Sequence, residues 1–377
     1  MPGFELIGKE EHEELNDLMT NSGILFRHGF DALRNNIYKV KEFENNFAEF
    51  MQVKNALAVT SGTSALHVAL KAFGIGAGDE VITQAFTFVA TVEAIVESGA
   101  KPVVCDIDET LNLDSSYLDK YVNTNTKAII VVHMLGTPCN MNGVLKFAKK
   151  HNLKVIEDTA WGCGGKFNQQ YLGTLGDAGT YSFDFAKTIT TGEGGMVVIK
   201  DDLAFERAKA YHDHGHENNP SLPRWEDSRS SSGFNYRMSE LQGAIGIAQL
   251  KKLNFIVDSQ RSNASRIKSI LLQKQYKIRY VPEHSFETCD AVVFFAENKQ
   301  EAISIRNKLL KCNISTKILP EAMSWHFAES WDHIDELKND NKMPDLKISR
   351  SILEKAVALP VFVNMKEDYF SSLKSVL

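Results

Sequence analysis

The chain has 377 residues, 43% of them hydrophobic, and 42 Lys plus Arg against 48 Asp plus Glu give a formal net charge of −6. That length predicts two domains, and the mildly acidic balance argues against a nucleic-acid or anionic-membrane partner. The apolar runs are much shorter than the ~20 residues that span a bilayer, the start lacks the features of a signal peptide, and five scattered cysteines form no CxxC pair. We therefore expect a cytoplasmic globular enzyme.

Residues 55–200 alternate short β-rich runs with helical patterns such as 89–97. The runs are continuously apolar, as strands covered on both faces require, and we expect strands at 57–60, 80–83, 102–106, 128–132 and 154–158. This alternation predicts a mostly parallel, doubly wound α/β sheet. Two further strands, 180–184 and 196–199, are expected around a glycine-rich turn.

Beyond residue 200 the pattern changes. We expect a helix over 201–211, a polar loop over 212–234, and a long helix over 239–272 that breaks or bends near Asn254. The rest predicts a smaller α+β domain with a strand over 291–296, a helix over 299–311 and a strand over 314–319. Placing the boundary in the long helix gives a large domain of residues 1–250 and a small C-terminal domain of residues 251–377.

The turn Ser61-Gly62-Thr63-Ser64 follows an expected strand and opens a helix. Free N–H groups and the helix dipole make such a turn an anion site, to which Thr63 adds a hydroxyl. An ordinary Ser/Thr helix cap is the commoner explanation of this pattern when it is taken alone.

Two charged residues stand at the ends of expected strands. Asp158 lies at the carboxyl edge of the sheet, where open α/β sheets place ligands, and could hold a protonated heterocyclic nitrogen or cap the next helix. Lys187 follows another strand and precedes a turn rich in threonine and glycine. Burial there would lower its pKa and raise the fraction of free amine able to form a Schiff base. A surface lysine beside a flexible loop is the alternative.

Other side chains are ambiguous one by one. Phe88 could stack on a planar ring or pack in the core. Asn235 and Arg237 precede the long helix and could bind oxyanions, or Asn235 could cap that helix. The alternating histidines 212, 214 and 216 lack a carboxylate or cysteine cluster that would complete a metal site, so we expect no metal and solvated or substrate-facing histidines.

The order of these features is more informative than any one of them. A phosphate turn, an aromatic residue, a strand-end aspartate, Ser182 and then a lysine form the inventory of a pyridoxal 5'-phosphate (PLP) site. At this point the chain resembles the sugar aminotransferases of the DegT/DnrJ/StrS type, in the aspartate aminotransferase fold class. The stretches that carry the resemblance are VTSGTSALHVAL (59–70), GDEVITQAFTFVATVEAI (78–95), VIEDTAWGCGG (155–165), LGTLGDAGTYSFDFAKTITTGEGGMVV (172–198) and GFNYRMSELQGAIG (233–246).

The resemblance implies a PLP-dependent transferase of fold type I, with a mostly parallel seven-stranded sheet in the large domain and a smaller C-terminal α+β domain. It implies that Lys187 forms the Schiff base with PLP and later moves a proton. Asp158 would pair with the pyridine nitrogen, and Phe88 would stack on the ring.

The resemblance also implies which residues bind the cofactor's phosphate and which residue reaches a partner subunit. Gly62, Thr63 and Ser182 would bind the phosphate, and Asn235 would reach the phosphate of the neighbouring subunit's cofactor, so that a homodimer shares its active sites. Arg237 would help to receive the carboxylate of the amino donor.

Two departures from the family pattern concern the site. Trp161 stands where the family usually has Gln or His to hold the cofactor's phenolic oxygen, and an indole N–H donates one hydrogen bond but cannot accept one. The segment 211–217 replaces the usual single His-Gly, and we expect its His214 to face the substrate, as we do for His326. The stretch 27–30 lies where relatives place substrate-contacting loops, or it is an ordinary helix start.

The implied reaction moves the amino group of L-glutamate to a keto or aldehyde sugar. Lysine at 187 disfavours the family's dehydratases, which carry histidine there, and the intact site disfavours a regulator that has lost the chemistry.

The expected acceptor is an octulosonate aminated at carbon 8, giving 8-amino-3,8-dideoxy-manno-octulosonate for lipopolysaccharide. Trp161, the insert 184–186 and the histidine-rich loop favour this branch, and Arg224 and Arg229 could bind the sugar's carboxylate. A nucleotide-linked keto-hexose is the alternative.

Overall fold

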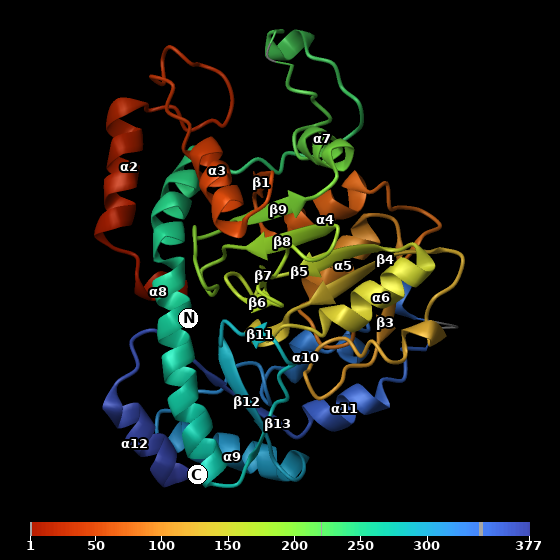
Figure 1. The fold of residues 1–377 in the computed structure, drawn as a ribbon, viewed down its shortest axis with the longest axis vertical. Helices are drawn as coiled ribbons and strands as arrows, with labels where there is room; N and C mark the ends of the chain where they lie inside the picture. Colours follow the sequence, from red (N-terminus) through yellow and green to blue (C-terminus); the bar gives the residue numbers. More distant parts are fainter. Residues whose placement is uncertain (1, 220, 339–341) are drawn as a thin grey trace.

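A seven-stranded sheet forms the centre of the larger part of the molecule (Figure 1). The computed structural model describes residues 2–219, 221–338 and 342–377. The strand order is β1-β9-β8-β5-β4-β2-β3, and β9 is antiparallel to both neighbours while the other pairs are parallel. The expected sheet is thus confirmed, with strands β1 (Ala56–Val59), β2 (Glu80–Gln84), β3 (Lys101–Cys105), β4 (Thr126–Val132), β5 (Lys154–Asp158), β8 (Ala178–Ser182) and β9 (Gly195–Ile199).

Helices cover both faces of this sheet, which explains why its strands are continuously apolar. In β4, Ala128 and Ile130 belong to the core beneath α4, whereas Ile129 and Val131 pack toward α6. Successive side chains of a strand point to opposite faces, so a strand buried on both sides needs apolar residues at every position. The covering helices are α3 (Lys39–Met51), α4 (Gly62–Ala72), α5 (Val89–Glu97), α6 (Met141–His151) and α7 (Asp202–Tyr211).

The long helix α8 (Glu240–Gln273) connects the large sheet with the C-terminal part (Figure 1). Ser239 caps it and accepts a hydrogen bond from the Gln242 N–H. The helix is continuous through Asn254, so the expected break is wrong, while a bend there stays a prediction. Leu253, Ile256 and Val257 are buried in the core around this position, and that packing outweighs the weak helix preference of asparagine. The division at residue 250 falls inside α8 and stays a prediction.

The C-terminal part is built on the small antiparallel sheet β10 (Lys277–Ile278), β12 (Ala291–Phe295) and β13 (Ala356–Pro360). The strand expected over 314–319 is wrong. Ile318 has φ +68, outside the strand region, and the Lys317 N–H donates to the Ala358 carbonyl from a turn. The elements around this sheet are α9 (Lys299–Lys311), α10 (Met323–His326), α11 (Lys347–Leu353) and α12 (Glu367–Val376).

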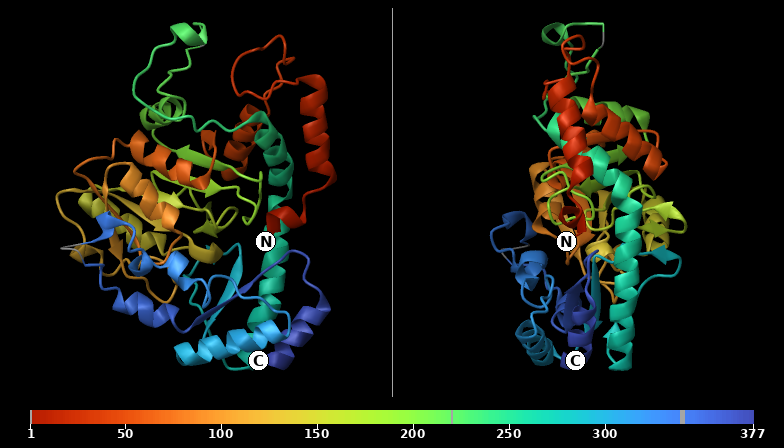
Figure 2. Two further views of the ribbon diagram at one scale, coloured as in Figure 1. Left: turned by 180° about the vertical axis from the view of Figure 1, so that it is seen from behind. Right: turned by 90° about the vertical axis from the view of Figure 1, so that its left-hand side faces the viewer.

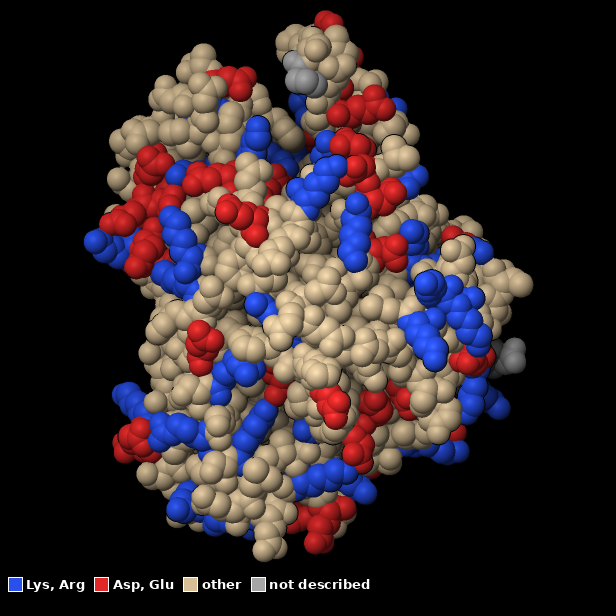
Figure 3. All heavy atoms as spheres, in the orientation of Figure 1, with Lys and Arg blue, Asp and Glu red and all other residues tan. Residues whose placement is uncertain are grey.

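Two segments project from the same end of the molecule (Figures 1 and 2). One is residues 22–38, between α2 (Lys9–Asn21) and α3, and the other is the expected polar loop 212–234, between α7 and α8. Figure 3 shows a notch between them. Among the described residues, no helix is both long and apolar enough to cross a membrane. The remaining elements are α1 (Pro2–Glu5), β6 (Lys166–Phe167), β7 (Gln170–Tyr171), β11 (Ser285–Phe286) and short 3-10 turns at 118–120, 134–136, 224–226, 328–330 and 335–337.

Candidate active site

Asp158 lies at the carboxyl edge of the sheet, where β5 ends beside β8. Its side chain is buried; Thr91 Oγ1 donates a hydrogen bond to Oδ2 at 2.8 Å, and the Ala160 N–H donates to Oδ1 at 3.1 Å. Burial raises the pKa of Asp158, while the hydrogen bond from Thr91 opposes that shift. A carboxylate held in this way is suited to pair with a cationic partner.

The end of β5 is held rigidly by the neighbouring Glu157. Its fully buried carboxylate accepts hydrogen bonds from the N–H groups of Gly173, Leu175 and Gly176 and lies 3.0 Å from His133 Nε2. The His133 N–H in turn donates to the Asp158 carbonyl. The peptide that carries Asp158 is therefore fixed before any ligand binds.

Lys187 lies in the loop between β8 and β9 and is 7% exposed. Its Nζ is 3.5 Å from the centroid of the Trp161 ring and 3.6 Å from Asp184 Oδ2. Burial lowers the pKa of Lys187, and Asp184 partly opposes that shift. The amine is therefore more often unprotonated than a solvated lysine would be.

The turn before α4 caps the helix and also presents backbone N–H groups that can bind an anion. Ser61 caps α4 by accepting a hydrogen bond from the Ser64 N–H. Among the described residues, nothing accepts a hydrogen bond from the N–H groups of Gly62 and Thr63. A Cβ at Gly62 would lie 2.8 Å from the Cβ of Ser182, so only glycine lets this helix start approach the end of β8. The two interpretations of the turn are therefore compatible.

Phe88 and His326 meet beside this edge. Phe88 is the N-cap residue of α5, is 42% exposed, and has its ring centroid 5.5 Å from that of His326. The backbone joins the two segments, since the Thr87 N–H donates to the His326 carbonyl. Burial lowers the pKa of His326 to about 4, so the ring is neutral at physiological pH.

The other predicted residues gather around Asp213, at the base of the projecting loop. Arg224 and Arg237 both pair with its buried Oδ1, and His28 Nε2 lies 3.2 Å from its Oδ2. His28 and Arg224 hold the pKa of Asp213 far below its usual range, against the effect of burial. Asn235 forms a backbone bridge with Asp213.

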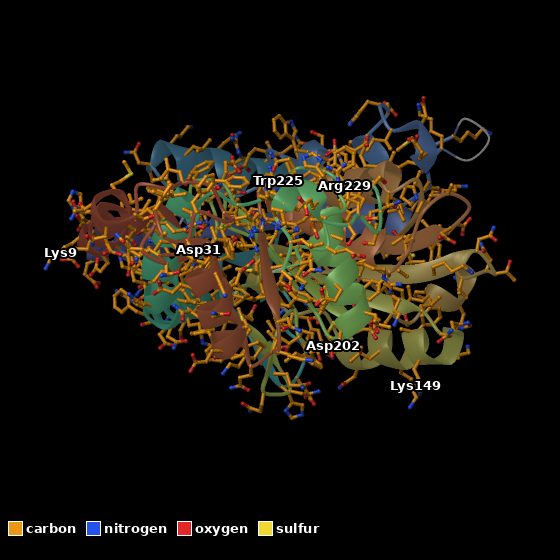
Figure 4. All side chains as sticks on the ribbon, turned by 90° about the horizontal axis from the view of Figure 1, so that it is seen from above. Lys9, Asp31, Lys149, Asp202, Trp225 and Arg229 are labelled. Atoms are coloured by element: carbon orange, nitrogen blue, oxygen red, sulfur yellow. The ribbon has the colours of Figure 1, made fainter. Side chains whose placement is uncertain are left out.

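The described residues contain no contact that joins Asn235, Arg237 or His214 to Lys187 or Asp158. Figure 4 looks onto this end of the molecule and shows the labelled Trp225 and Arg229 in the projecting loop. Arg229 is exposed, while Arg27 is engaged with Glu44 and the Ala58 carbonyl. Within one chain the predicted site residues thus form two separate clusters, one around Lys187 and Asp158 and the other around Asp213.

The first cluster fits the cofactor that the sequence predicts. PLP brings an aldehyde, a phosphate, a planar ring and a ring nitrogen that can be protonated. The chain offers a buried amine for the aldehyde and free N–H groups at a helix N-terminus for the phosphate. It also offers an exposed aromatic ring for the planar ring and a buried carboxylate for the ring nitrogen. Within the described residues, no group of three or more His, Cys, Asp or Glu side chains could hold a metal ion.

Sequence reasoning missed several residues of this cluster. Thr91 lies in a quoted stretch, but its hydroxyl contact with Asp158 depends on how α5 packs beside β5. Lys317 and Asp290 come from the C-terminal part and carry no local pattern that points to the site. Only the tertiary fold brings them to Trp161.

Comparisons with known proteins agree with this geometry. The model of the DegT/DnrJ/EryC1/StrS aminotransferase family matches residues 28–375. GDP-perosamine synthase of Escherichia coli O157:H7 is 36% identical over 313 residues, covering 83% of this chain and 82% of the relative. The spore coat polysaccharide biosynthesis protein SpsC of Bacillus subtilis is 32% identical over 380 residues, covering 96% and 92%.

Solved structures share the whole architecture. An aminotransferase from Psychrobacter cryohalolentis superposes with a TM-score of 0.87 at 27% identity, covering 98% of this chain and 96% of that chain. PseC of Helicobacter pylori, an aminotransferase involved in the biosynthesis of pseudoaminic acid, gives 0.86 at 26% identity, covering 98% and 95%. The chain therefore belongs to the DegT/DnrJ/EryC1/StrS aminotransferase family and is a PLP-dependent aminotransferase.

Proposed function

We propose that this enzyme moves the amino group of L-glutamate to a keto or aldehyde sugar, with Lys187 as its catalytic residue. The observation that carries the proposal is that the Lys187 amine is buried in the same cluster as the Asp158 carboxylate, which accepts a hydrogen bond from the Thr91 hydroxyl. The named relatives support a sugar as the acceptor, because two of them are perosamine synthase and a polysaccharide biosynthesis protein.

Each residue of the first cluster has a separate task in this proposal. PLP, when bound, supplies the electron sink and carries the amino group between the two substrates. Lys187 anchors the cofactor through its Nζ, which afterwards accepts and returns a proton. Asp158 would hold the ring nitrogen protonated, and the exposed Phe88 would stack on the ring, with Trp161 beside Lys187 Nζ. The Gly62 and Thr63 N–H groups and the Ser182 hydroxyl bind the phosphate.

The acceptor sugar has two candidates. The perosamine synthase relatives favour a nucleotide-linked keto-hexose. The octulosonate acceptor expected from the sequence is the second candidate, and with it a place in lipopolysaccharide biosynthesis. Trp161 and the insert 184–186 favour it, but Arg224, one of the two arginines expected to bind its carboxylate, is engaged with Asp213.

We further propose that the enzyme is a cytoplasmic homodimer in which Asn235, Arg237 and His214 serve the partner's site. In the described part of one chain, no contact joins these residues to Lys187. Large apolar side chains are exposed on both projecting segments, among them Phe30 and Trp225, as expected of a surface that a second copy covers. All five cysteines are unpaired, as in proteins of reducing compartments.

Reduction with borohydride tests the role of Lys187 directly. After loading with PLP and reduction, mass spectrometry is expected to find the cofactor on the peptide that contains Lys187. Lys187→Arg should lose this label and reduce turnover by about 10²- to 10⁴-fold, because arginine cannot form the bond. Lys200→Arg is the matched control, since Lys200 Nζ donates a hydrogen bond to the Leu175 carbonyl outside the site. A label that persists in Lys187→Arg would refute the proposal.

Steady-state assays with L-glutamate decide the acceptor. Turnover of nucleotide-linked keto-hexoses alone would exclude the octulosonate, and turnover of the free sugar acid alone would exclude the nucleotide-linked sugar. An enzyme that accepts neither class would contradict the assignment of a sugar acceptor.

A further inference from the structure

A second lysine, Lys317, faces the same indole ring as Lys187. Its Nζ is 4.7 Å from the centroid of Trp161, compared with 3.5 Å for Lys187 Nζ. Lys317 comes from the C-terminal part of the chain, whereas Trp161 and Lys187 come from the large sheet. The site is therefore built from both parts, and Trp161 lies where they meet.

The chain holds Lys317 in place firmly. Its N–H donates to the Ala358 carbonyl of β13, and the next residue, Ile318, has φ +68. A β-branched residue in this region is strained, and such strain persists where the surrounding structure over-determines it, often at functional sites. The strain is located at the one turn that directs Lys317 toward Trp161.

Asp290 orients the ammonium group. Its Oδ1 is 2.7 Å from Lys317 Nζ, and the exposed fractions of the two side chains are 2% and 10%. The backbone of Asp290 packs closely on the larger part of the molecule, since a Cβ at Gly136 would lie only 3.0 Å from the Asp290 nitrogen. Two residues before Asp290, the Thr288 hydroxyl donates a hydrogen bond to the Trp161 carbonyl. The ion pair compensates for the lost hydration of the lysine.

An ammonium group has three N–H donors, and the contact with Asp290 Oδ1 accounts for one of them. The remaining donors can serve an acceptor that enters beside Lys187. The other charged side chains that act on Lys187 most strongly, Asp184, Asp290 and Asp158, are anionic and would repel a carboxylate. Within one chain, Arg237 lies in the other cluster and pairs with Asp213, whereas Lys317 is a cation placed beside Lys187 itself.

We propose that Lys317, oriented by Asp290, binds a carboxylate of the amino donor and so determines the specificity for that substrate. This inference rests on the proposed function, because it takes an amino acid as the donor. Lys187 acts on the amino group, and Lys317 positions the donor from the opposite part of the molecule. Charge-assisted hydrogen bonds of this kind are about twice as strong as neutral ones.

Binding of glutarate, a dicarboxylate that lacks the reacting amine, tests the proposal by calorimetry on the PLP-loaded enzyme. Lys317→Met is expected to weaken glutarate binding about ten- to hundredfold, and Lys317→Arg to retain most of it. Lys268→Met is the matched control, because Lys268 also pairs with a carboxylate of the C-terminal part, Glu287, but within the described residues no contact joins it to the Trp161 ring. Its Nζ is 2.6 Å from Glu287 Oε2. It should bind glutarate like the unchanged enzyme.

Borohydride labelling of Lys187 in the same variants separates the two proposals. If the unchanged enzyme fails to label at Lys187, the proposed function fails. If labelling is intact but the unchanged enzyme binds no glutarate, or Lys317→Met binds it equally well, the role of Lys317 is overturned. A variant Lys317→Met that binds glutarate normally but alters the absorbance of the bound cofactor also overturns it, because Lys317 would then serve the cofactor.

Discussion

The Thr91 hydroxyl and the Ala160 N–H together hold the Asp158 carboxylate at the sheet edge. Thr91→Val removes the hydrogen bond from Oγ1 to Asp158 Oδ2. Because that bond stabilises the charged carboxylate, its loss raises the pKa of Asp158 and weakens its pairing with a cationic ring nitrogen. A bond to a charged group contributes about 1.5–3 kcal/mol, so the dissociation constant of PLP should rise roughly tenfold or more.

Absorbance titration with PLP measures this effect. Thr83→Val is the control, because the hydroxyl of Thr83 in β2 is equally buried but donates to the Ile130 carbonyl in β4. If both variants lose the same affinity, general destabilisation rather than the Asp158 contact would be the cause.

The titration of Lys187 gives a prediction with a definite sign. Asp184 stabilises the protonated amine and so raises the pKa of Lys187, against the larger effect of burial. Asp184→Asn therefore lowers that pKa, and the midpoint of the pH profile for attachment of PLP to Lys187 should move to lower pH. Trapping with borohydride at a series of pH values measures the midpoint.

The exposed pair of Asp202 with Lys54 provides the control for this profile. Asp202→Asn removes one carboxylate at a distant surface and should leave the midpoint unchanged. A midpoint that stays in place or moves to higher pH in Asp184→Asn would contradict the electrostatic account of Lys187.

At the scale of elements, the projecting segment 22–38 is organised around one buried arginine. Arg34 Nη2 lies 3.1 Å from Glu240 Oε1 at the start of α8, and both side chains are fully buried. Arg34 also donates to the carbonyls of Phe26 and Ile37. The segment is thus held to α8 by a desolvated ion pair.

Arg34→Met leaves the Glu240 carboxylate buried without its charge partner. Loss of one partner of a buried pair costs about 3–5 kcal/mol, and the double variant Arg34→Met/Glu240→Gln should recover part of that loss. Urea unfolding measures the free energies. Arg266→Met, which breaks an exposed pair with Glu367, should change the free energy of unfolding much less, because solvent screens that pair. Equal losses in both single variants would show that burial of the pair is unimportant.

At the scale of the whole molecule, exposed apolar side chains concentrate on the two projecting segments. Phe30 and Leu33 lie on one and Trp225 on the other, with exposed fractions of 56%, 69% and 85%. The proposed homodimer would cover them, since large exposed apolar patches mark association surfaces. The same surface would carry Asn235 and Arg237 into the partner's site.

Sedimentation velocity tests this assembly. The double variant Phe30→Ser/Trp225→Ser should shift the dimer toward monomer and lower turnover with it. Phe255→Ser, which changes a 60% exposed residue on α8, should leave the assembly unchanged. A monomeric unchanged enzyme with full turnover would refute the shared site.

Much of this protein follows from its sequence alone. Continuous apolar runs predicted the parallel strands because a strand buried on both faces needs apolar residues at successive positions, and β5 was placed at its observed bounds. The order of phosphate turn, aspartate and lysine predicted a PLP site, because these residues stand at the ends of strands that meet at one sheet edge. The resemblance of the quoted stretches supplied the family, which the family model confirms.

The tertiary structure decided what local pattern could not express. Packing around Leu253 and Ile256 keeps α8 continuous where Asn254 suggested a break. The turn at Ile318 takes the place of an expected strand, because the Lys317 N–H finds its acceptor in the distant β13. Contacts of Thr91 with Asp158, and of Lys317 with Trp161, join residues remote in the chain. Such contacts are set by how elements pack against one another, and the local order of residues carries no record of that packing.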